Sequence, residues 1–311
     1  MSVKTYQVAQ HLFQMKIEGD SFLWPLMEEP YGPFETEYGP FKTEGTPFET
    51  PESDPLFCLQ VQDRVDRDAS MTKVYSSKGS AEPGMIVLEV WRDGAGHYFE
   101  FTQPGSDTVN GRLHVDNELK EATVSLEGTR SQQWLTFNTA VNFCYLLATA
   151  PLRTVLTHAS CVRYKGKAYL FLGRSGTGKS THSRMWLSAL EGVELMNDDH
   201  PVVRVHEDGT PVVYGSPWSG KTRCYKNVEA PAGGIVRISR APYNRARRLT
   251  MIESYASLMT SCSGMTWEKE LADGRHRTIE EIISRVPCWV MECLPDEDAA
   301  RVCQTAVTNV E

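Results

Sequence analysis

One short glycine-rich segment has the residue types and the spacing of a phosphate-binding loop. Residues 173–180 read GRSGTGKS, which fits G-x-x-x-x-G-K-[ST], and the apolar run 168–172 precedes them. In such a loop backbone N–H groups surround a phosphate, and the following helix adds the positive end of its dipole. Lys179 would reach the β- and γ-phosphates, and Ser180 would hold Mg²⁺. The sequence therefore predicts a nucleotide-binding loop between a strand and a helix. The alternative is a glycine-rich turn with a surface lysine.

The residues expected to contact the nucleotide are those of the loop and of the helix start. They are Gly173, Arg174, Ser175, Gly176, Thr177, Gly178, Lys179, Ser180 and Thr181.

Titratable side chains stand on both sides of this loop in the sequence. His158 precedes it, and the adjacent carboxylates Asp198 and Asp199 follow a short apolar run after it. Carboxylates at the C-terminal end of a strand can face Mg²⁺ or a substrate hydroxyl. A hard cation prefers oxygen ligands, and an alcohol that attacks a γ-phosphate needs a nearby base. We expect Ser180, Asp198 and Asp199 near the metal. The alternatives are a plain turn before Pro201 and a histidine satisfied within a hairpin.

The strand that leads into the loop is expected to belong to a hairpin. The strand-like run 154–162 precedes the turn 165–167, and the run 168–172 follows it. A βαβ unit would need a much longer crossover. An antiparallel neighbour for this strand is unlike the ordinary doubly wound nucleotide fold.

Other segments predict the elements around this centre. The runs 5–8, 56–61, 85–91 and 97–101 alternate with turn residues, which indicates a β-rich, mostly antiparallel N-terminal domain. Residues 132–150 have the apolar stripe of a helix. We expect two domains, 1–128 and 129–311. A Gly-Pro-Phe repeat of period seven, with Phe34, Phe41 and Phe48, indicates an extended loop or a partner-binding lid.

Further strands and helices are expected downstream. A hairpin over 201–205 and 211–215 leads into the segment 216–223, which carries Lys221 and Arg223. Either cation could neutralise charge on a transferring phosphoryl group, or the segment is an exposed turn. The remaining expectations are strands over 231–238 and 287–292 and helices over 252–259, 278–285 and 296–307.

Composition limits the classes of partner and compartment. The net charge of −8 disfavours nucleic acid, and the basic cluster 237–248 is expected to be a solvated face. No run reaches the ~20 apolar residues of a membrane span, and no signal peptide precedes the first strand. We expect a cytoplasmic protein. Its eight cysteines lack C-x-x-C spacing, so free thiols and no zinc site are expected.

Three motifs together resemble the core of the HPr kinase/phosphorylase and phosphoenolpyruvate carboxykinase superfamily. They are His158-Ala159-Ser160, the loop Ser175-Gly176-Thr177-Gly178-Lys179-Ser180 and Asn197-Asp198-Asp199-His200, in that order, and the resemblance covers about residues 150–235. It implies an α/β (α+β) fold with a mixed-sheet P-loop kinase core. It also implies ATP and Mg²⁺, or Mn²⁺, as cofactors.

The resemblance also assigns roles. Lys179 would contact the phosphates, Ser180 would coordinate the metal, and Asp198 or Asp199 would supply a metal ligand and the base. His158 would lie near the metal or phosphate, and His182 and His200 are weaker candidates. Family members are often oligomers, so the protein could form a homo-oligomer, but no sequence feature here sets a number.

The chain also departs from both named enzymes. Thr181 stands where HPr kinases place Glu, and their C-terminal signature is missing. Carboxykinases are much longer, and their oxaloacetate-binding arginines have no clear counterpart. The sequence looks more like compact bacterial HPr-kinase-like proteins, some of which phosphorylate peptide hydroxyls.

The expected function is an ATP-dependent kinase that acts on a hydroxyl of a peptide, protein or small molecule. The catalytic residues would be His158, Lys179, Asp198, Asp199 and Arg223. The alternatives are a non-catalytic nucleotide-binding regulatory module and a carboxykinase-like enzyme for a small carboxylic acid.

Overall fold

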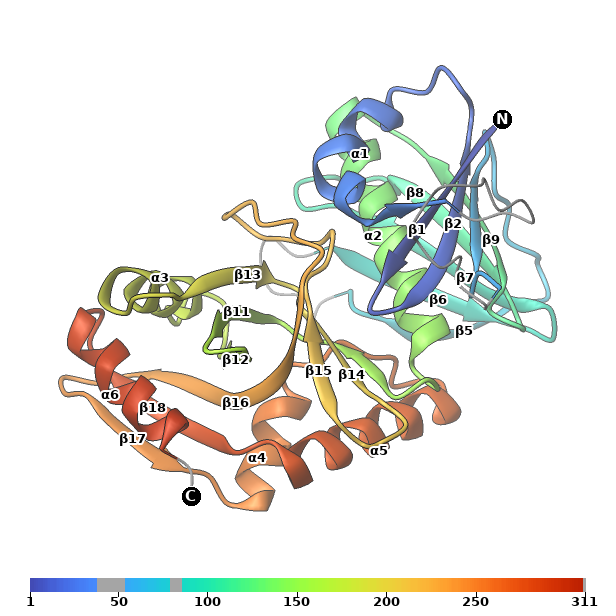
Figure 1. Cartoon of the computed structure of the whole chain (residues 1–311). Coiled ribbons are helices and arrows are strands. Elements are labelled where there is room, and N and C mark those ends of the chain that lie inside the picture. The colour runs from blue at the N-terminus through green and yellow to red at the C-terminus, as the bar shows by residue number, and fades with distance from the viewer. Residues whose placement is uncertain (38–53, 79–85, 310–311) are drawn as a thin grey trace. The chain divides into compact units, whose positions relative to one another are not determined.

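The computed structural model describes residues 1–37, 54–78 and 86–309, and it divides into two compact units. The N-terminal unit is Met1–Thr149 and the C-terminal unit is Ala150–Glu311. The expected boundary lay before the helix that starts near residue 130, whereas the units divide after it. In the described residues the protein is an α/β protein with two large mixed sheets and six α-helices (Figure 1).

The N-terminal unit is built on a nine-stranded sheet with the order β3-β1-β2-β4-β9-β8-β7-β6-β5. Its pairs are antiparallel except β2 with β4 and β4 with β9, which confirms the mostly antiparallel expectation. The strands are β1 (Ser2–Val8), β2 (His11–Ile17), β3 (Glu35–Thr36), β4 (Cys58–Val61), β5 (Thr72–Ser76), β6 (Val87–Arg92), β7 (Gly96–Thr102), β8 (Gly111–Asp116) and β9 (Glu121–Leu126).

Two helices accompany this sheet. The helix α1 (Leu23–Tyr31) and the short 3₁₀ turn η1 (Gly32–Phe34) were not expected from the sequence, because Pro30 and Pro33 disfavour a helix there. The helix α2 (Arg130–Thr149) was expected, and it packs on β8 and β9. Phe34 is buried in this unit, whereas Phe41 and Phe48 lie outside the described residues.

The C-terminal unit is built on a second nine-stranded sheet with the path β10-β14-β15-β16-β12-β11-β13, extended by β18 and β17 beside β16. The strands are β10 (Thr154–Leu156), β11 (Ala159–Tyr164), β12 (Lys167–Leu172), β13 (Glu194–Asp199), β14 (Val202–Val205), β15 (Pro211–Tyr214), β16 (Glu229–Arg240), β17 (Arg245–Arg248) and β18 (Cys288–Cys293). The helices are α3 (Lys179–Ala189), α4 (Met251–Met259), α5 (Lys269–Arg285) and α6 (Glu297–Thr308).

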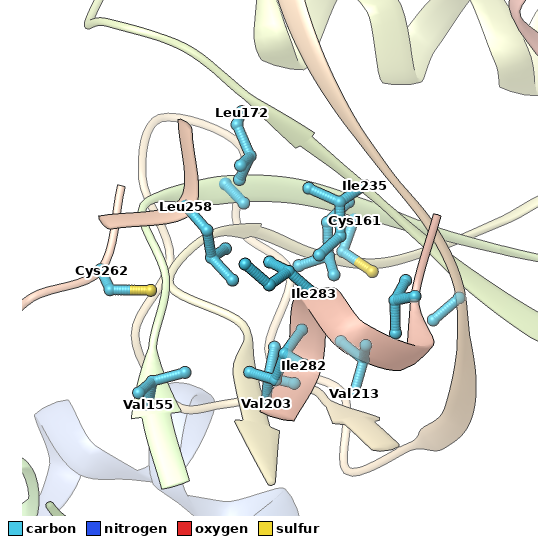
Figure 2. Packing of buried hydrophobic residues seen from close by; sticks show 14 of the residues in the cluster. Val155, Cys161, Leu172, Val203, Val213, Ile235, Leu258, Cys262, Ile282 and Ile283 are labelled. Atoms are coloured by element: carbon cyan, nitrogen blue, oxygen red, sulfur yellow. The ribbon is translucent and has the colours of Figure 1, made fainter. Parts of the chain in front are cut away.

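Apolar clusters cover both faces of this sheet. On one face Leu172 of β12 packs with Leu258 of α4 and Ile282 of α5 (Figure 2). Leu170 of β12 belongs to the same cluster. On the other face Phe171 packs with Trp186 of α3 and with residues of α6. Burying apolar side chains on both faces explains why β12 is a continuous apolar run rather than an alternating one. The sheet therefore holds the end of β12 between two helical layers.

The hairpin that feeds the loop is present. Strands β11 and β12 are antiparallel, and Lys165 and Gly166 form their turn with φ of 48° and 75°. Positive φ at both central residues matches the twist of the flanking strands. β12 also has a parallel neighbour, β16, so the sheet is mixed at its centre. The expected run 154–162 is two strands, because β10 leaves to pair with β14.

Most of the elements expected downstream of β13 are present in the structure. The hairpin of β14 and β15, the strands β16 and β18 and the helices α4 and α6 lie where they were expected. Helix α5 begins at Lys269, well before the expected start. Its first half lacks an apolar stripe, and it contains Gly274, whose missing Cβ admits the carbonyl oxygen of Ala150. All eight cysteines are free thiols. No described helix combines the length and apolar character needed to cross a membrane.

Candidate active site

The register of three strands brings the three sequence motifs to one edge of the sheet. Ala159 of β11 lies opposite Leu172 of β12 on one side and opposite Asp199 of β13 on the other. His158 directly precedes Ala159, and the glycine-rich loop directly follows Leu172. Because antiparallel register fixes which residues are neighbours, these segments meet although they are far apart in the chain.

The loop at this edge has the backbone freedom and the open donors that an anion site needs. Gly176 and Gly178 have φ of 76° and 114°, in the region that favours glycine. Gly178 is the N-cap of α3, and no side chain caps this helix end or adds an acidic residue to its first turn. The first N–H groups of α3 therefore have no side-chain acceptor, which is the arrangement that binds phosphate.

The side chain of Lys179 lies within the protein and not in solvent. It is 8% exposed, and its Nζ lies 3.0 Å from Nε2 of His158 and 3.1 Å from the carbonyl oxygen of Gly173. Burial lowers the pKa of this ammonium, while Asp199 and Asp198 act in the opposite direction. The cation is thus held at the mouth of the loop with only neutral acceptors in direct contact.

Ser180 and Asp198 form a pair of oxygen donors at the start of α3. The Ser180 hydroxyl donates to Oδ1 of Asp198 at 2.8 Å, and Asp198 is 4% exposed. Hydroxyl and carboxylate oxygens are ligands that Mg²⁺ accepts when phosphate and water complete its octahedron. Within the described residues no group of three or more His, Cys, Asp or Glu side chains could hold a metal ion.

Asp199 lies between two histidines. Its Oδ1 is 3.1 Å from Nε2 of His158, and its Oδ2 is 3.2 Å from Nδ1 of His200. Burial alone raises the pKa of this carboxyl, but the hydrogen bonds from His158 and His200 outweigh burial, so the pKa lies below its usual range. Asp199 also has φ of 141°, a conformation that costs a non-glycine residue energy. The carboxylate is therefore ionised and held in one place by a strained backbone.

His158 cannot serve both of its neighbours at the same time. One ring nitrogen, Nε2, faces Lys179 and Asp199. A nitrogen that accepts from an ammonium has no proton to donate to a carboxylate. If Lys179 turns to a bound phosphate, Nε2 is free to carry a proton and to donate it in a hydrogen bond to Asp199. The geometry thus couples the position of Lys179 to the hydrogen bonding of the carboxylate.

Asn197 positions the segment after β15 beside the two carboxylates. Its Nδ2 lies 3.2 Å from the carbonyl oxygens of both Ser216 and Trp218, and its Oδ1 accepts from the N–H of His200. The N–H of Gly220 donates to the carbonyl oxygen of Asp198 at 2.7 Å. A side chain at Gly220 would press on Asp199. This buried amide therefore links β13 to the segment that carries the cations.

The two cations of that segment lie on the surface of the protein. Lys221 and Arg223 are exposed and follow Gly220 on the segment that touches Asp198. Arg174 and Ser175 of the loop are also exposed. The structure thus brings together His158, Lys179, Ser180, Asp198 and Asp199, while the side chain of Arg223 is exposed.

A cavity of about 570 Å³ opens beside the loop. Its lining includes Thr177, Gly178, Thr181 and His182 from the loop and α3, and Arg240 from the end of β16. His182 is buried, and desolvation lowers its pKa to about 4. A neutral His182 can accept the hydrogen bond from Nε1 of Trp186 at 3.1 Å. The cavity has the size and the mixed lining of a small-molecule site.

Arg240 is a site residue that sequence reasoning missed. Its guanidinium donates to the carbonyl oxygens of Gly176 and Thr177. In the sequence it is one of several arginines in the cluster 237–248, which was expected to be a solvated face. Arg240, Arg245 and Arg247 are all exposed, and Arg247 and Arg245 form ion pairs with Glu253 and Glu292. No local signal separates Arg240 from them, because the loop it touches is far away in the chain.

No protein-family model matches the chain, and no curated protein matches it either.

Proposed function

We propose that the C-terminal unit binds ATP with Mg²⁺ and transfers the γ-phosphoryl group to a hydroxyl of a peptide, protein or small molecule. The proposal includes an HPr-kinase-like P-loop core, which the sequence motifs suggest. One observation carries it: Lys179, Ser180, Asp198 and Asp199 converge at the edge where an uncapped helix begins. Phosphoryl transfer depends mainly on positioning and on charge stabilisation, which these groups can supply.

The chain's own residues account for binding. The phosphates would accept hydrogen bonds from the loop N–H groups, and Lys179 would leave His158 to contact them. The nucleoside would occupy the cavity between α3 and Arg240, whose volume suits it. Ser180 and Asp198 would hold Mg²⁺, which would screen the phosphate charge. Arg240 would keep the loop carbonyls turned away from the anion.

Asp199 is the residue that fits the role of base. Its carboxylate is ionised because the two histidines lower its pKa. The acceptor oxygen forms a bond to the γ-phosphorus, the bond from that phosphorus to the β-bridging oxygen breaks, and the hydroxyl proton passes to Asp199. The pKa is low for a base, so proton transfer would come late, after most of the bond to the leaving oxygen has broken. His158 and His200 would keep the carboxylate oriented.

The test is transfer of label from γ-labelled ATP to components of a cell extract. Lys179→Ala should abolish labelling and ATP turnover while the melting temperature stays close to that of the unmodified protein. The matched control is Lys167→Ala, which removes an exposed lysine at the far end of β12, the strand that leads into the loop.

Wild-type labelling by the Lys179→Ala protein would contradict the proposal. Tight ATP binding with no labelled acceptor in any extract would favour a non-catalytic nucleotide-binding module. Turnover with Mn²⁺ and oxaloacetate would favour carboxykinase-like chemistry.

A further inference from the structure

Helix α5 contains a buried arginine that has no counter-ion. Arg275 is 7% exposed, and its Nε has no hydrogen-bond partner. Among the described residues, Nε is the guanidinium nitrogen of Arg275 that is both shielded from solvent and without a partner, and no ion pair to this side chain is formed there. A buried charge normally has a partner, because leaving water without one is costly. The unpaired guanidinium therefore points to a ligand that supplies the missing anion.

The surrounding segment is shaped to hold this side chain. The guanidinium and Cδ of Arg275 lie against Gly264, where any Cβ would overlap Nη1 and Cζ. The neighbouring Cys262 does not supply a thiolate that could neutralise Arg275. Burial raises its pKa to about 12 even though Arg275 acts to lower it, so the thiol stays neutral. The glycine thus makes room for a cation that its neighbours do not neutralise.

The same segment adjoins the candidate active site. The N–H of His158 donates to the carbonyl oxygen of Ser261 at 2.6 Å, and Thr157 forms a β-bridge with Cys262. Cys262 belongs to the core cluster that packs the sheet against α4 and α5 (Figure 2). Only a few residues therefore separate the backbone that holds His158 from Gly264, which packs against Arg275.

We propose that Arg275 binds an oxyanion, a carboxylate or phosphate group, of the molecule that receives the phosphoryl group. The guanidinium offers several N–H donors in a planar fork that matches either group. The identity of this molecule as the phosphoryl acceptor rests on the proposed function. The presence of an oxyanion site does not. The acceptor would be an anionic molecule, with its hydroxyl near Asp199 and its oxyanion at Arg275.

The test measures anion binding without relying on the phosphate loop. In Lys179→Ala protein, sodium acetate or inorganic phosphate is raised at constant ionic strength while the melting temperature is recorded. At about ten times the dissociation constant the melting temperature should rise by about 3 °C. Adding Arg275→Met should remove this rise. The matched control Arg277→Met, an exposed arginine on the same helix, should keep it.

The two anions separate the two chemistries. A rise with acetate and phosphate alike assigns a carboxylate site, and a rise with phosphate alone assigns a phosphate site. An equal rise in the Arg275→Met protein, or no rise with either anion before that change, overturns the proposal.

A purely structural role is tested in the absence of anion. Arg275→Met should leave the melting temperature unchanged or higher, because it removes an unpaired buried charge. A variant that folds but has lost much of its stability would overturn the proposal. If this variant does not fold, Gly264→Ala decides the question, because it displaces the guanidinium and should abolish the anion effect. An anion effect with no kinase activity in the unmodified protein would refute the proposed function and leave this site standing.

Discussion

The two units contain sheets of similar size, but their buried polar groups are used differently. In the N-terminal unit Gln103 donates to Thr136 and to the carbonyl of Gln132, and its N–H donates to Asn110. These bonds join the β7–β8 connection to α2, and each of the polar groups involved has a partner within the unit. In the C-terminal unit Lys179 and Asp199 contact groups that a ligand could replace. Buried polar groups with permanent hydrogen-bond partners stabilise a fold. Polar groups whose partners a ligand can replace, or whose backbone is strained, indicate a site for chemistry.

The difference between the two units should be largest when one carboxylate is neutralised in each of them. Asp199→Asn should lower phosphoryl transfer by roughly 10³-fold or more, because the base and its charge are lost. ATP binding should persist, as measured by calorimetric titration. In the N-terminal unit Asp116→Asn weakens a carboxylate that accepts from the N–H groups of Lys120 and Glu121. That variant should lose stability and keep transfer. Equal loss of transfer in both proteins would erase the distinction.

A fall in pH should destabilise the C-terminal unit through protonation of His182. The pKa of this histidine falls from 6.5 to about 4 because burial disfavours the charged ring. As the pH falls, His182 of the unfolded chain therefore takes up a proton before His182 of the folded protein does. The contribution of neutral, buried His182 to the free energy of unfolding is complete above pH 6.5 and declines as the pH falls toward 4. The loss is roughly 3 kcal/mol in that window. Protonation would also remove the acceptor for Trp186.

His182→Gln should flatten this acid dependence. The amide oxygen of Gln can still accept from Trp186, but the side chain does not titrate. Differential scanning calorimetry between pH 7 and pH 4 measures the change. A melting temperature that falls equally steeply in both proteins would place the acid-sensitive group elsewhere.

The smallest expected effect concerns how the loop is held. Arg240→Ala removes donors to the carbonyls of Gly176 and Thr177, and the loop loses part of its preorganisation. We expect about tenfold weaker Mg·ADP binding, or about 1.4 kcal/mol, by calorimetric titration. Arg245→Ala, on β17, the next strand in the chain, removes only an exposed ion pair and should leave affinity unchanged. Equal affinities in both variants would show that Arg240 does not organise the loop.

Contiguous patterns were the part of the site that could be predicted. The loop 173–180 was recognisable because its glycines, Lys179 and Ser180 are neighbours in the chain. The strand before it and the hairpin turn had equally local signals, and the structure has both. Asp198 and Asp199 were found because they follow an apolar run that ends a strand.

Residues that act from a distance were not predictable. Arg240 and Arg275 each carry an ordinary side chain in an ordinary local sequence, and only packing sets them apart. The beginning of α5 was missed for the same reason, since Gly274 disfavours a helix locally and is required by the close approach of Ala150. The sequence did not show which sheet α2 covers, because an apolar stripe does not identify its partner; the structure packs α2 on β8 and β9.

The sequence by itself determined the phosphate-loop motif, the strands and turn that lead into it, and the chemical types of its flanking residues. These follow from local backbone preferences and apolar periodicity, which act over a few residues. Only the tertiary structure decided which neighbours each group has. The register of β11 places His158 between Lys179 and Asp199, and helix packing buries Arg275 without a counter-ion. Distances and burial set charge and hydrogen bonding, and both arise only when distant segments of the chain pack together.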